Sequence, residues 1–344
     1  MARKQTLYER LDDLVEQFAP ELREAFRAAI SDVVDNVVIK DLVEAIENGD
    51  PIRAFQILGF SDAAMRPLTA VIERLFETGG VTVGSTFPRL LNTATGRGVY
   101  RFDVRNSRAE KWLRERSASL VVKIQDDTAT ALRNILTDGM AAGRNPNSVA
   151  KDIVGRINPL TNKREGGIVG LTPRFERAVA RSREELTGFD YRYFNRERRD
   201  KRFDSIVKKA FAEKRPLTVA EVEKLSGRYA DRLLQLRGET IARTEAIVSL
   251  NQAEHEAGKQ AVDMGAVKQK NIKRIWDSAG DDGRTRKTHL ELDGQIVEMD
   301  QPFVSDSGAR MMYPGDTSLG APGEETINCR CKVRMKIDWL ADVK

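Results

Sequence analysis

The residues best suited to chemistry lie near the C-terminus of the chain. Cys329 and Cys331 are its two cysteines, and His289 is one of its two histidines. Thiolates two residues apart can both reach one metal ion, and three nitrogen and sulfur donors suit zinc, which takes four ligands at about 2.0–2.3 Å. A disulfide between residues two apart would be strained. Three residues are alternatives for the fourth ligand: Asp277, Asp293 and His255.

The segment between these residues gives a second reason to expect that they meet. Residues 300–328 are polar, rich in glycine and proline, and too poor in apolar side chains to form a core. Ordering such a segment costs about 1–2 kcal/mol per residue, so something at its two ends must hold it. We therefore predict that the histidine and both cysteines converge. They do so either around zinc, the one cofactor that the residues suggest, or as a metal-free, partly apolar cluster near Trp276 and Phe303.

The same region also admits a catalytic interpretation. Arg286 and Arg330 could bind an acidic phosphodiester while His289 acts as the general base. Three observations oppose the catalytic interpretation. The sequence has no paired carboxylates typical of a two-metal nuclease, no glycine-rich phosphate loop and no dinucleotide fingerprint. We therefore expect no enzyme activity, with a nuclease-like DNA-processing enzyme as the alternative. A network of charge-assisted hydrogen bonds that ties loops together is the more ordinary role for charged residues here. Its expected members are Trp276, Asp277, Arg286, Asp293 and Arg330.

Three short motifs, in order along the chain, resemble a known family. They are Ala242-Arg243-Thr244-Glu245, then Arg286-x-x-His289 with Leu292-Asp293-Gly294 behind it, and finally Asn328-Cys329-Arg330-Cys331. This ordered set is similar to that of the Mu-type F head-morphogenesis family, the minor head proteins of tailed bacteriophages. The resemblance covers about residues 110–337, and residues 1–105 are only loosely similar to such proteins.

The resemblance implies a structural role. Such proteins are present in few copies per particle, associate with the portal and enter the head during assembly. The implied partners are the phage portal protein, major capsid or scaffold protein, and packaged double-stranded DNA, in assembly or DNA ejection. The implied location is the virion, in the capsid interior near the portal vertex, and the host cytoplasm during assembly. Toxin-fused relatives exist, but the chain ends soon after Cys331, so we expect no effector domain. A host cytoplasmic DNA-binding protein is the rival outside the phage setting.

The first of these motifs lies inside a predicted helix. Arg243 and Glu245 point to different faces of it, because helix residues two apart do not meet. Thr244 has no local reason to be there. We expect a buried salt bridge, formed by Arg243 or Glu245, that anchors this helix to the C-terminal region.

A basic segment at 191–215 is the candidate DNA contact. It contains ten Lys/Arg and four Asp/Glu, a net charge of +6, whereas residues 1–50 have a net charge of −6. Its cations would neutralise phosphates without reading bases, and its aromatic side chains could stack on bases or pack in the core. An ordinary solvated face is the alternative, because Glu197 and Asp200 interrupt the run. The residues expected at the DNA are Arg192, Arg196, Arg198, Arg199, Lys201 and Arg202.

Most of the chain must be helical to position these residues. Apolar side chains recur at helical spacing over 7–30, 31–49, 63–78, 107–139, 148–157, 172–194, 218–236 and 239–264. Pro20 is a candidate break, and Gly79-Gly80 is expected to end the helix that precedes it. Loops are expected over 79–106, with a short extended pair, and over 158–170. Short strands are expected at 272–278, 294–299 and 332–337.

The sequence therefore predicts a mainly α protein. We expect an acidic N-terminal helical unit over 1–105, a long-helix middle region over 107–265 and a small C-terminal α+β domain of short strands and long loops over 270–340. The 344 residues contain no apolar run of about 18 residues, so no membrane partner is expected. Acidic residues follow the basic start, so no secretory signal is visible. Two cysteines suit a reducing cytoplasm.

Overall fold

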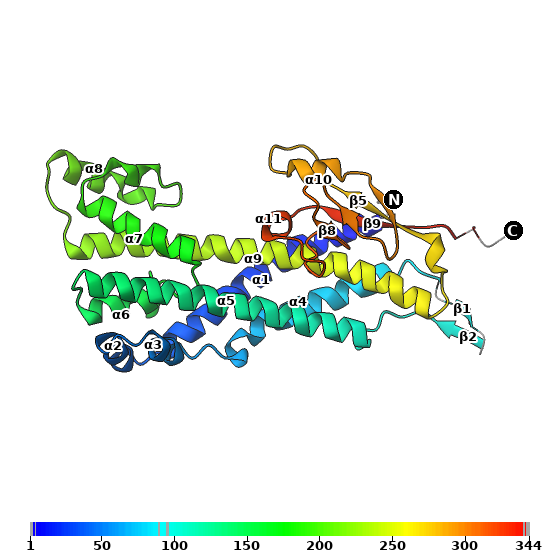
Figure 1. Ribbon diagram of the computed structural model, residues 1–344, viewed down its shortest axis with the longest axis horizontal. Helices are drawn as coiled ribbons and strands as arrows, with labels where there is room; N and C mark the ends of the chain where they lie inside the picture. Colours follow the sequence, from blue (N-terminus) through cyan, green and yellow to red (C-terminus); the bar gives the residue numbers. More distant parts are fainter. Residues whose placement is uncertain (1–2, 4, 89, 94–95, 340, 342–344) are drawn as a thin grey trace. The chain divides into compact units, whose positions relative to one another are not determined.

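The protein is mainly α-helical with a few short antiparallel strands, as predicted (Figure 1). A computed structural model describes residues 3, 5–88, 90–93, 96–339 and 341. Positions 89, 94, 95 and 340, which belong to predicted segments, lie outside the described residues. The longer helices are α1 (Leu7–Asp35), α2 (Ile39–Glu47), α3 (Pro51–Leu58), α4 (Asp62–Gly84), α5 (Ser107–Ala141), α6 (Pro146–Val154), α7 (Pro173–Thr187), α8 (Asp204–Ala212) and α9 (Val219–Asp263).

The shorter elements fill the remaining segments. Short helices are η1 (Tyr191–Asn195), η2 (Lys201–Phe203), η3 (Gln269–Asn271), α10 (Lys287–Glu291) and α11 (Gly323–Thr326). The strands are β1 (Leu90–Thr93), β2 (Gly96–Val99), β3 (Arg156–Asn158), β4 (Lys163–Glu165), β5 (Ile272–Asp277), β6 (Ile296–Glu298), β7 (Phe303–Val304), β8 (Arg310–Met311) and β9 (Lys332–Ile337). None of the described helices has both the length and the apolar character needed to cross a membrane.

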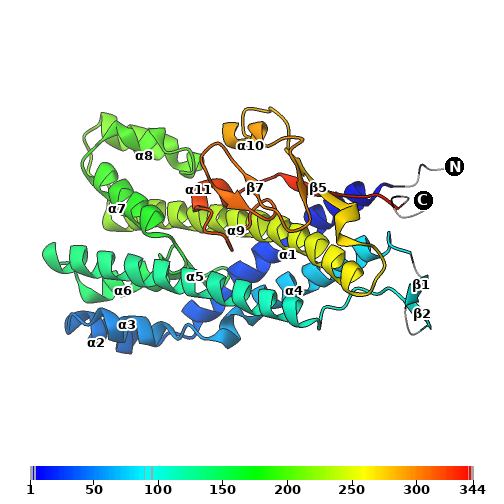
Figure 2. The ribbon, with the colours of Figure 1, turned by 45° about the vertical axis from the view of Figure 1, so that its right-hand side comes forward.

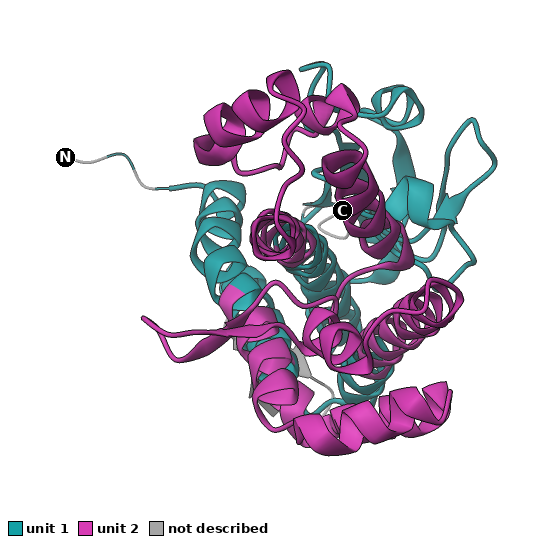
Figure 3. Ribbon diagram, turned by 90° about the vertical axis from the view of Figure 1, so that its left-hand side faces the viewer, with its two compact units in different colours: residues 1–23, 69–117, 239–344 teal, residues 24–68, 118–238 magenta. Residues whose placement is uncertain are grey.

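The chain divides into two compact units that are discontinuous in sequence (Figure 3). Unit 1 contains residues 1–23, 69–117 and 239–344, and unit 2 contains 24–68 and 118–238. This division differs from the three consecutive segments that the sequence suggests. The reason is that α1, α4, α5 and α9 each contribute residues to both units, so the boundaries fall inside helices rather than in loops.

A three-stranded antiparallel sheet organises the C-terminal part of unit 1. The strand order is β6-β5-β9, and the register places Trp276 of β5 opposite Val333 of β9. Side chains of β5 alternate between buried and half-buried, the pattern of a strand with one face on a core. The three predicted strands are thus confirmed. In both views these strands and helices α10 and α11 lie along the C-terminal half of α9 (Figures 1 and 2).

Two predicted helix breaks are absent. Pro20 lies inside the continuous helix α1, and α4 runs on through Gly79-Gly80 to Gly84. The two glycines serve close packing instead. A Cβ on Gly79 would lie 2.7 Å from Cδ2 of Leu250, and one on Gly80 would meet the ring of Phe102. The prediction was wrong because sequence alone does not separate a glycine that stops a helix from one that admits a neighbour.

Helix starts follow their capping residues. Thr172 caps α7, and Thr218 and Glu221 form a capping box at the start of α9, where Oε2 of Glu221 accepts the Thr218 N–H at 2.7 Å. Asn145 caps α6, which begins two residues before the predicted start at 148. The two helices predicted over 218–264 are one helix of 45 residues.

Candidate functional site

The predicted convergence of one histidine and two cysteines is present in unit 1. Nδ1 of His289 lies 3.5 Å from Sγ of Cys329 and 3.5 Å from Sγ of Cys331. The three donor atoms all lie within 4.8 Å of one another, and the exposed fraction of each residue is 2% or less. We call these three residues the thiol–histidine cluster.

Three local features place the cluster. His289 is on α10, and its ring lies edge-on to the indole of Trp276, with ring centroids 5.2 Å apart. The two cysteines precede β9, where the ladder with β5 holds the chain. Asn328, just before them, has a φ of 57°, a left-handed conformation that asparagine tolerates better than most residues. Trp276 and Phe303 pack in the same core as both thiols.

A carboxylate lies behind the histidine. Oε2 of Glu325 is 2.9 Å from Nε2 of His289, and Glu325 also accepts hydrogen bonds from Thr288 at 3.0 Å and Ser307 at 2.6 Å. Burial opposes ionisation of Glu325, but these two hydrogen bonds and the nearby imidazole lower its pKa. A carboxylate behind a ligating imidazole is the usual second contact of a metal-bound histidine. Sequence analysis missed Glu325 because only the folded loop brings it there.

The two thiols differ in their acidity. A hydrogen bond from Cys329 lowers the pKa of Cys331 against the effect of burial, and His289 lowers it further. The same hydrogen bond and burial raise the pKa of Cys329. The backbone N–H of Ala279 also favours the Cys331 thiolate. A buried thiolate stabilised in this way is the form in which cysteine binds metals.

The spacing of the donors fits a zinc site. With Zn–S near 2.3 Å and Zn–N near 2.0 Å, a tetrahedral site separates sulfur from nitrogen by about 3.5 Å, which is the separation observed. Among the described residues, the group contains three donors, and the three alternatives for a fourth are not among them. Asp277 pairs with Arg334 at 2.7 Å, and Asp293 accepts the Ser278 N–H at 2.7 Å. His255 lies beside the Tyr313 ring, and burial lowers its pKa.

The predicted charged network ties loops together, but not as a single network. Both guanidinium NH groups of Arg330 contact Asp282, at 2.8 and 2.6 Å. Arg286 donates to the carbonyl of Ile327 at 2.5 Å. Asp277 and Asp293 have the separate partners given above. Each contact fixes one loop locally, which suits the structural role rather than a shared anion site.

One face of α9 holds the segment that carries the cysteines. Oγ1 of Thr244 accepts the Asn328 N–H at 3.0 Å, and Oδ1 of Asn251 accepts the Val333 N–H at 3.1 Å. Residues 244 and 251 are seven apart and therefore lie on the same helix face. Asn251 was missed, because an isolated polar residue in a helix gives no signal of its backbone partner.

The salt bridge that was expected to anchor α9 to the C-terminal region is not formed by Arg243 or Glu245. Glu245 is buried, but it pairs with Arg116 of α5, through two contacts of 2.7 Å. Arg243 is exposed and has no salt bridge with a described residue. Thr244, between them, makes the contact with the C-terminal region. A hydroxyl that pairs with a backbone N–H can be buried without the desolvation cost of a charge.

Arg274 of β5 was also missed. It is fully buried, and it donates to the carbonyls of Glu298 at 3.1 Å and of Gln301 and Met312. Its guanidinium also lies 5.4 Å from the centroid of the Phe303 ring. Burial lowers its pKa to about 10. The residue therefore holds the loop at 298–312 from inside, a task that the sequence analysis gave to the thiol–histidine cluster alone.

Most of the residues expected at DNA, in the basic segment of unit 2, form ion pairs within the chain. Four of its six predicted residues pair with carboxylates: Arg192 with Asp190, Arg196 with Glu185, Arg199 with Asp204, and Arg202 with Asp200. Arg198 and Lys201 are exposed and have no salt bridge with a described residue. The aromatics Tyr193, Phe194 and Phe203 pack in a core with Val207 and Phe211. Of the six residues expected at DNA, two thus have no salt bridge with a described residue.

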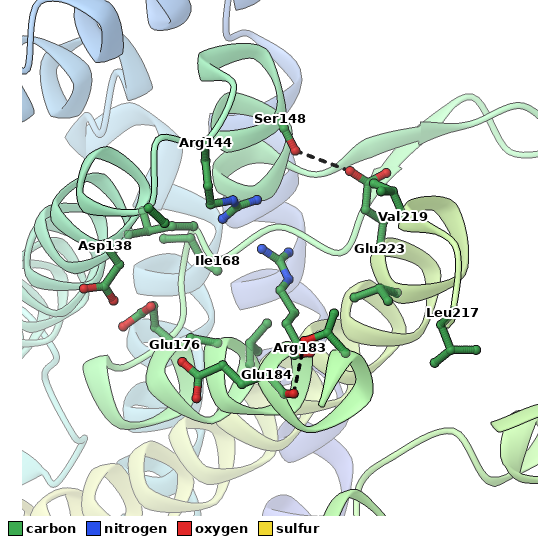
Figure 4. A pocket seen from close by; sticks show the side chains of 16 residues that line it. Asp138, Arg144, Ser148, Ile168, Glu176, Arg183, Glu184, Leu217, Val219 and Glu223 are labelled. Carbon is green, nitrogen blue, oxygen red and sulfur yellow. Dashed lines mark hydrogen bonds between the residues drawn. The ribbon is translucent and has the colours of Figure 1, made fainter. Parts of the chain in front are cut away.

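A pocket of about 560 Å³ in unit 2 was not predicted (Figure 4). Figure 4 shows the guanidinium groups of Arg144 and Arg183 on one side, and the carboxylates of Asp138, Glu176 and Glu184 on another. Both arginines contact the buried carboxylate of Asp152, which Arg156 also pairs with at 2.8 Å. Burial raises the pKa of Glu176. Because Asp152 already binds the arginines, this pocket fits a structural salt-bridge cluster.

Comparison with known proteins supports the resemblance drawn from the motifs. Residues 220–334 match the family described as phage Mu protein F like protein. The matched segment holds the thiol–histidine cluster, most of the sheet and most of α9. The predicted resemblance to this class of phage head proteins is confirmed for the matched segment, which is about a third of the chain.

Three known proteins are similar to part of this chain. Minor head protein GP7 of Bacillus phage SPP1 is 38% identical over 82 residues, 24% of this chain and 25% of that protein. Uncharacterized protein YqbB of Bacillus subtilis (strain 168) is 31% identical over 103 residues, 30% of this chain and 31% of that protein. NAD(+)--arginine ADP-ribosyltransferase EFV of Enterococcus faecalis (strain ATCC 700802 / V583) is 34% identical over 105 residues, 29% of this chain and 19% of that protein. The matches thus span a third or less of each relative. No solved structure matches.

Proposed function

We propose that this chain is a structural minor head protein of a tailed phage, bound to the portal protein inside the head. The observation that carries the proposal is the match of residues 220–334 to phage Mu protein F like proteins. The similarity to a protein named minor head protein over part of its length supports it. Further partners under this proposal are the major capsid or scaffold protein and packaged double-stranded DNA.

The geometry supports a binding protein rather than an enzyme. His289 is 1% exposed and is enclosed by two thiols, a carboxylate and an indole ring. A general base must reach its substrate within hydrogen-bond distance, and this imidazole has no free face toward solvent. Arg286 and Arg330, which a nuclease would need at the phosphate, contact Ile327 and Asp282 instead. The similarity to an ADP-ribosyltransferase covers a fifth of that protein and carries no residue role to this chain.

We further propose that His289, Cys329 and Cys331 hold one zinc ion. The support is the 3.5 Å spacing of the donors, the stabilised thiolate and the carboxylate at the far nitrogen of the imidazole. A bound zinc would join the two ends of the loop at 300–328 and contribute to the stability of unit 1. A metal-free cluster held by hydrogen bonds and apolar contacts is the alternative.

The portal proposal is tested by co-expression. Its first check is the gene neighbourhood, in which a portal gene just upstream is expected, with a scaffold or capsid gene downstream. The full chain is then expressed with that portal protein, and the mixture is separated by size-exclusion chromatography. We expect the chain to elute with the portal oligomer. Separate elution at both low and moderate salt would contradict the proposal. Hydrolysis of DNA by the pure chain, lost in His289→Ala, would favour the enzyme.

A further inference from the structure

A shallow hollow of about 370 Å³ in unit 2 is lined by arginines and by no carboxylate. Its lining residues are Pro173, Arg174, Arg177, Ala178, Arg181 and Arg196. We call it the arginine hollow. Arg174, Arg177 and Arg181 are exposed and have no salt bridge with any described residue. The hollow lies outside the segment that matches phage Mu protein F like proteins, and sequence analysis singled out none of these three arginines.

The three exposed arginines share one face of α7. They are three and four residues apart, so their side chains are neighbours on the helix surface, where like charges destabilise a helix. Arg183, on the same helix, shows the opposite arrangement, because it is largely buried and contacts Asp152. Helix α7 therefore carries one arginine that contacts a buried carboxylate and three that have no salt bridge with a described residue, and Glu184 and Glu185 line a neighbouring hollow with Arg181. An anion supplied from outside would relieve the repulsion among the three exposed arginines.

Arg196 gives the hollow a fixed cation. Its guanidinium makes two contacts with Glu185, at 2.6 and 2.8 Å, and lies 5.4 Å from the centroid of the Tyr229 ring. These contacts hold the group in place, while a guanidinium has five N–H donors in all. Three exposed arginines around one fixed arginine leave the hollow positively charged even after Glu185 is counted.

We propose that the arginine hollow binds phosphates of the backbone of double-stranded DNA. Guanidinium groups match phosphate geometry through paired hydrogen bonds. The other lining residues are proline and alanine, which offer neither stacking surface nor polar groups for reading a base. Cations repeated along a helix suit a run of phosphates better than one small anion. The phosphate chemistry follows from the hollow itself, and the choice of DNA as its source rests on the proposed function.

The test compares two matched pairs of substitutions in the full chain. R177Q/R181Q removes two exposed arginines from the hollow, and R198Q/K201Q removes two exposed, unpaired cations of the basic segment. The change in net charge is the same, and circular dichroism melting checks that both variants fold. Binding to a labelled random-sequence duplex is measured by fluorescence anisotropy over a series of salt concentrations. A further series replaces chloride by inorganic phosphate at constant ionic strength.

We expect R177Q/R181Q to weaken binding about tenfold at low salt and to reduce the slope of log K against log salt by about 2, since each phosphate contact contributes about 0.9. R198Q/K201Q should change binding less than R177Q/R181Q. Equal losses in both pairs, a loss in R198Q/K201Q alone, or no duplex binding would overturn the proposal. Inorganic phosphate at constant ionic strength should displace the duplex from the parent chain, and equal displacement from R177Q/R181Q would overturn the proposal, because the competition would then lie outside the hollow. These assays use the purified chain, so a negative result would not contradict the head-protein proposal. In the same way, absence of the chain from purified phage particles would not contradict DNA binding by the hollow.

Discussion

Oγ1 of Thr244 accepts a hydrogen bond from the backbone N–H of Asn328 at 3.0 Å, directly before the first cysteine of the thiol–histidine cluster. The contact joins the first and last motifs of the phage-like segment, which lie more than eighty residues apart in sequence. It gives a reason for a threonine, Thr244, in the interior of helix α9: its hydroxyl binds a backbone group of another segment. It also shows that a neutral hydroxyl, rather than the charged residues beside it, attaches this end of the C-terminal region to α9.

Substitution of Thr244 by valine should therefore destabilise unit 1. The change keeps the shape but removes the acceptor of the Asn328 N–H, and a typical hydrogen bond contributes about 0.5–1.5 kcal/mol to stability. Arg243→Ala is the matched control, because Arg243 is the adjacent exposed residue and should change little. Denaturant unfolding and hydrogen exchange at residues 328–333 measure both. Equal stability of the two variants would show that the contact contributes nothing.

The purified full chain should contain about one zinc ion. Three buried donors at the spacing of a tetrahedral site predict it, and a chelator should then lower the melting temperature of unit 1. Cys329→Ser should lose the metal. His255→Gln, which alters the other buried histidine, should keep it. Metal content near zero by elemental analysis, together with no chelator effect, would leave the metal-free cluster.

Loss of the Asp152 carboxylate should strongly destabilise unit 2. Three arginines contact this buried group. Its removal leaves Arg144 and Arg183 without their carboxylate, whereas Arg156 keeps its pair with Glu223, and such a loss costs about 3–5 kcal/mol. Asp152→Asn is compared with Asp190→Asn, which breaks the exposed pair with Arg192 and should have a much smaller effect. Thermal and denaturant unfolding give the comparison, and similar losses in the two variants would contradict the assignment.

The stability of unit 1 should fall as the pH rises through neutrality. Glu254 accepts hydrogen bonds from Met335 N–H and the Tyr8 hydroxyl, and burial raises its pKa from 4.5 to about 7. The folded state thus holds a proton that the unfolded state releases. The stabilisation is fully present below about pH 4.5 and is lost as the pH rises through about 7, at most about 3 kcal/mol.

Glu254→Gln isolates this effect, because the amide oxygen can accept the same two hydrogen bonds without titrating. The stability difference between the parent chain and the variant should shift in favour of the variant between about pH 5 and about pH 8. A difference that does not change with pH would show that Glu254 is ionised throughout.

The sequence reached the candidate site through residues whose chemistry is rare. Two cysteines and one histidine have few roles, so their convergence could be predicted from the loop between them. Arg274, Asn251 and Glu325 could not be found in this way. Each binds backbone or side-chain groups of loops whose conformations depend on the whole unit. Arginine, asparagine and glutamate are also common residues, so a single one gives no signal of a specific role in the sequence.

Charge was the least informative pattern. The segment at 191–215 has a strong positive balance, yet Arg196 and Arg199 are held by Glu185 and Asp204. Exposed cations without a salt bridge to a described residue also occur outside this segment, on α7, at Arg174, Arg177 and Arg181. A net charge counts residues along the chain, whereas a phosphate meets only those side chains that no carboxylate has already bound.

The central claim is that this chain is a component of the phage head, and the most direct test is the protein content of purified particles. Quantitative mass spectrometry of intact virions should find the chain as a minor component, in few copies beside the portal protein. Particles made without its gene should lack it while they retain the portal protein. Virions that contain the portal protein but none of this chain would contradict the claim.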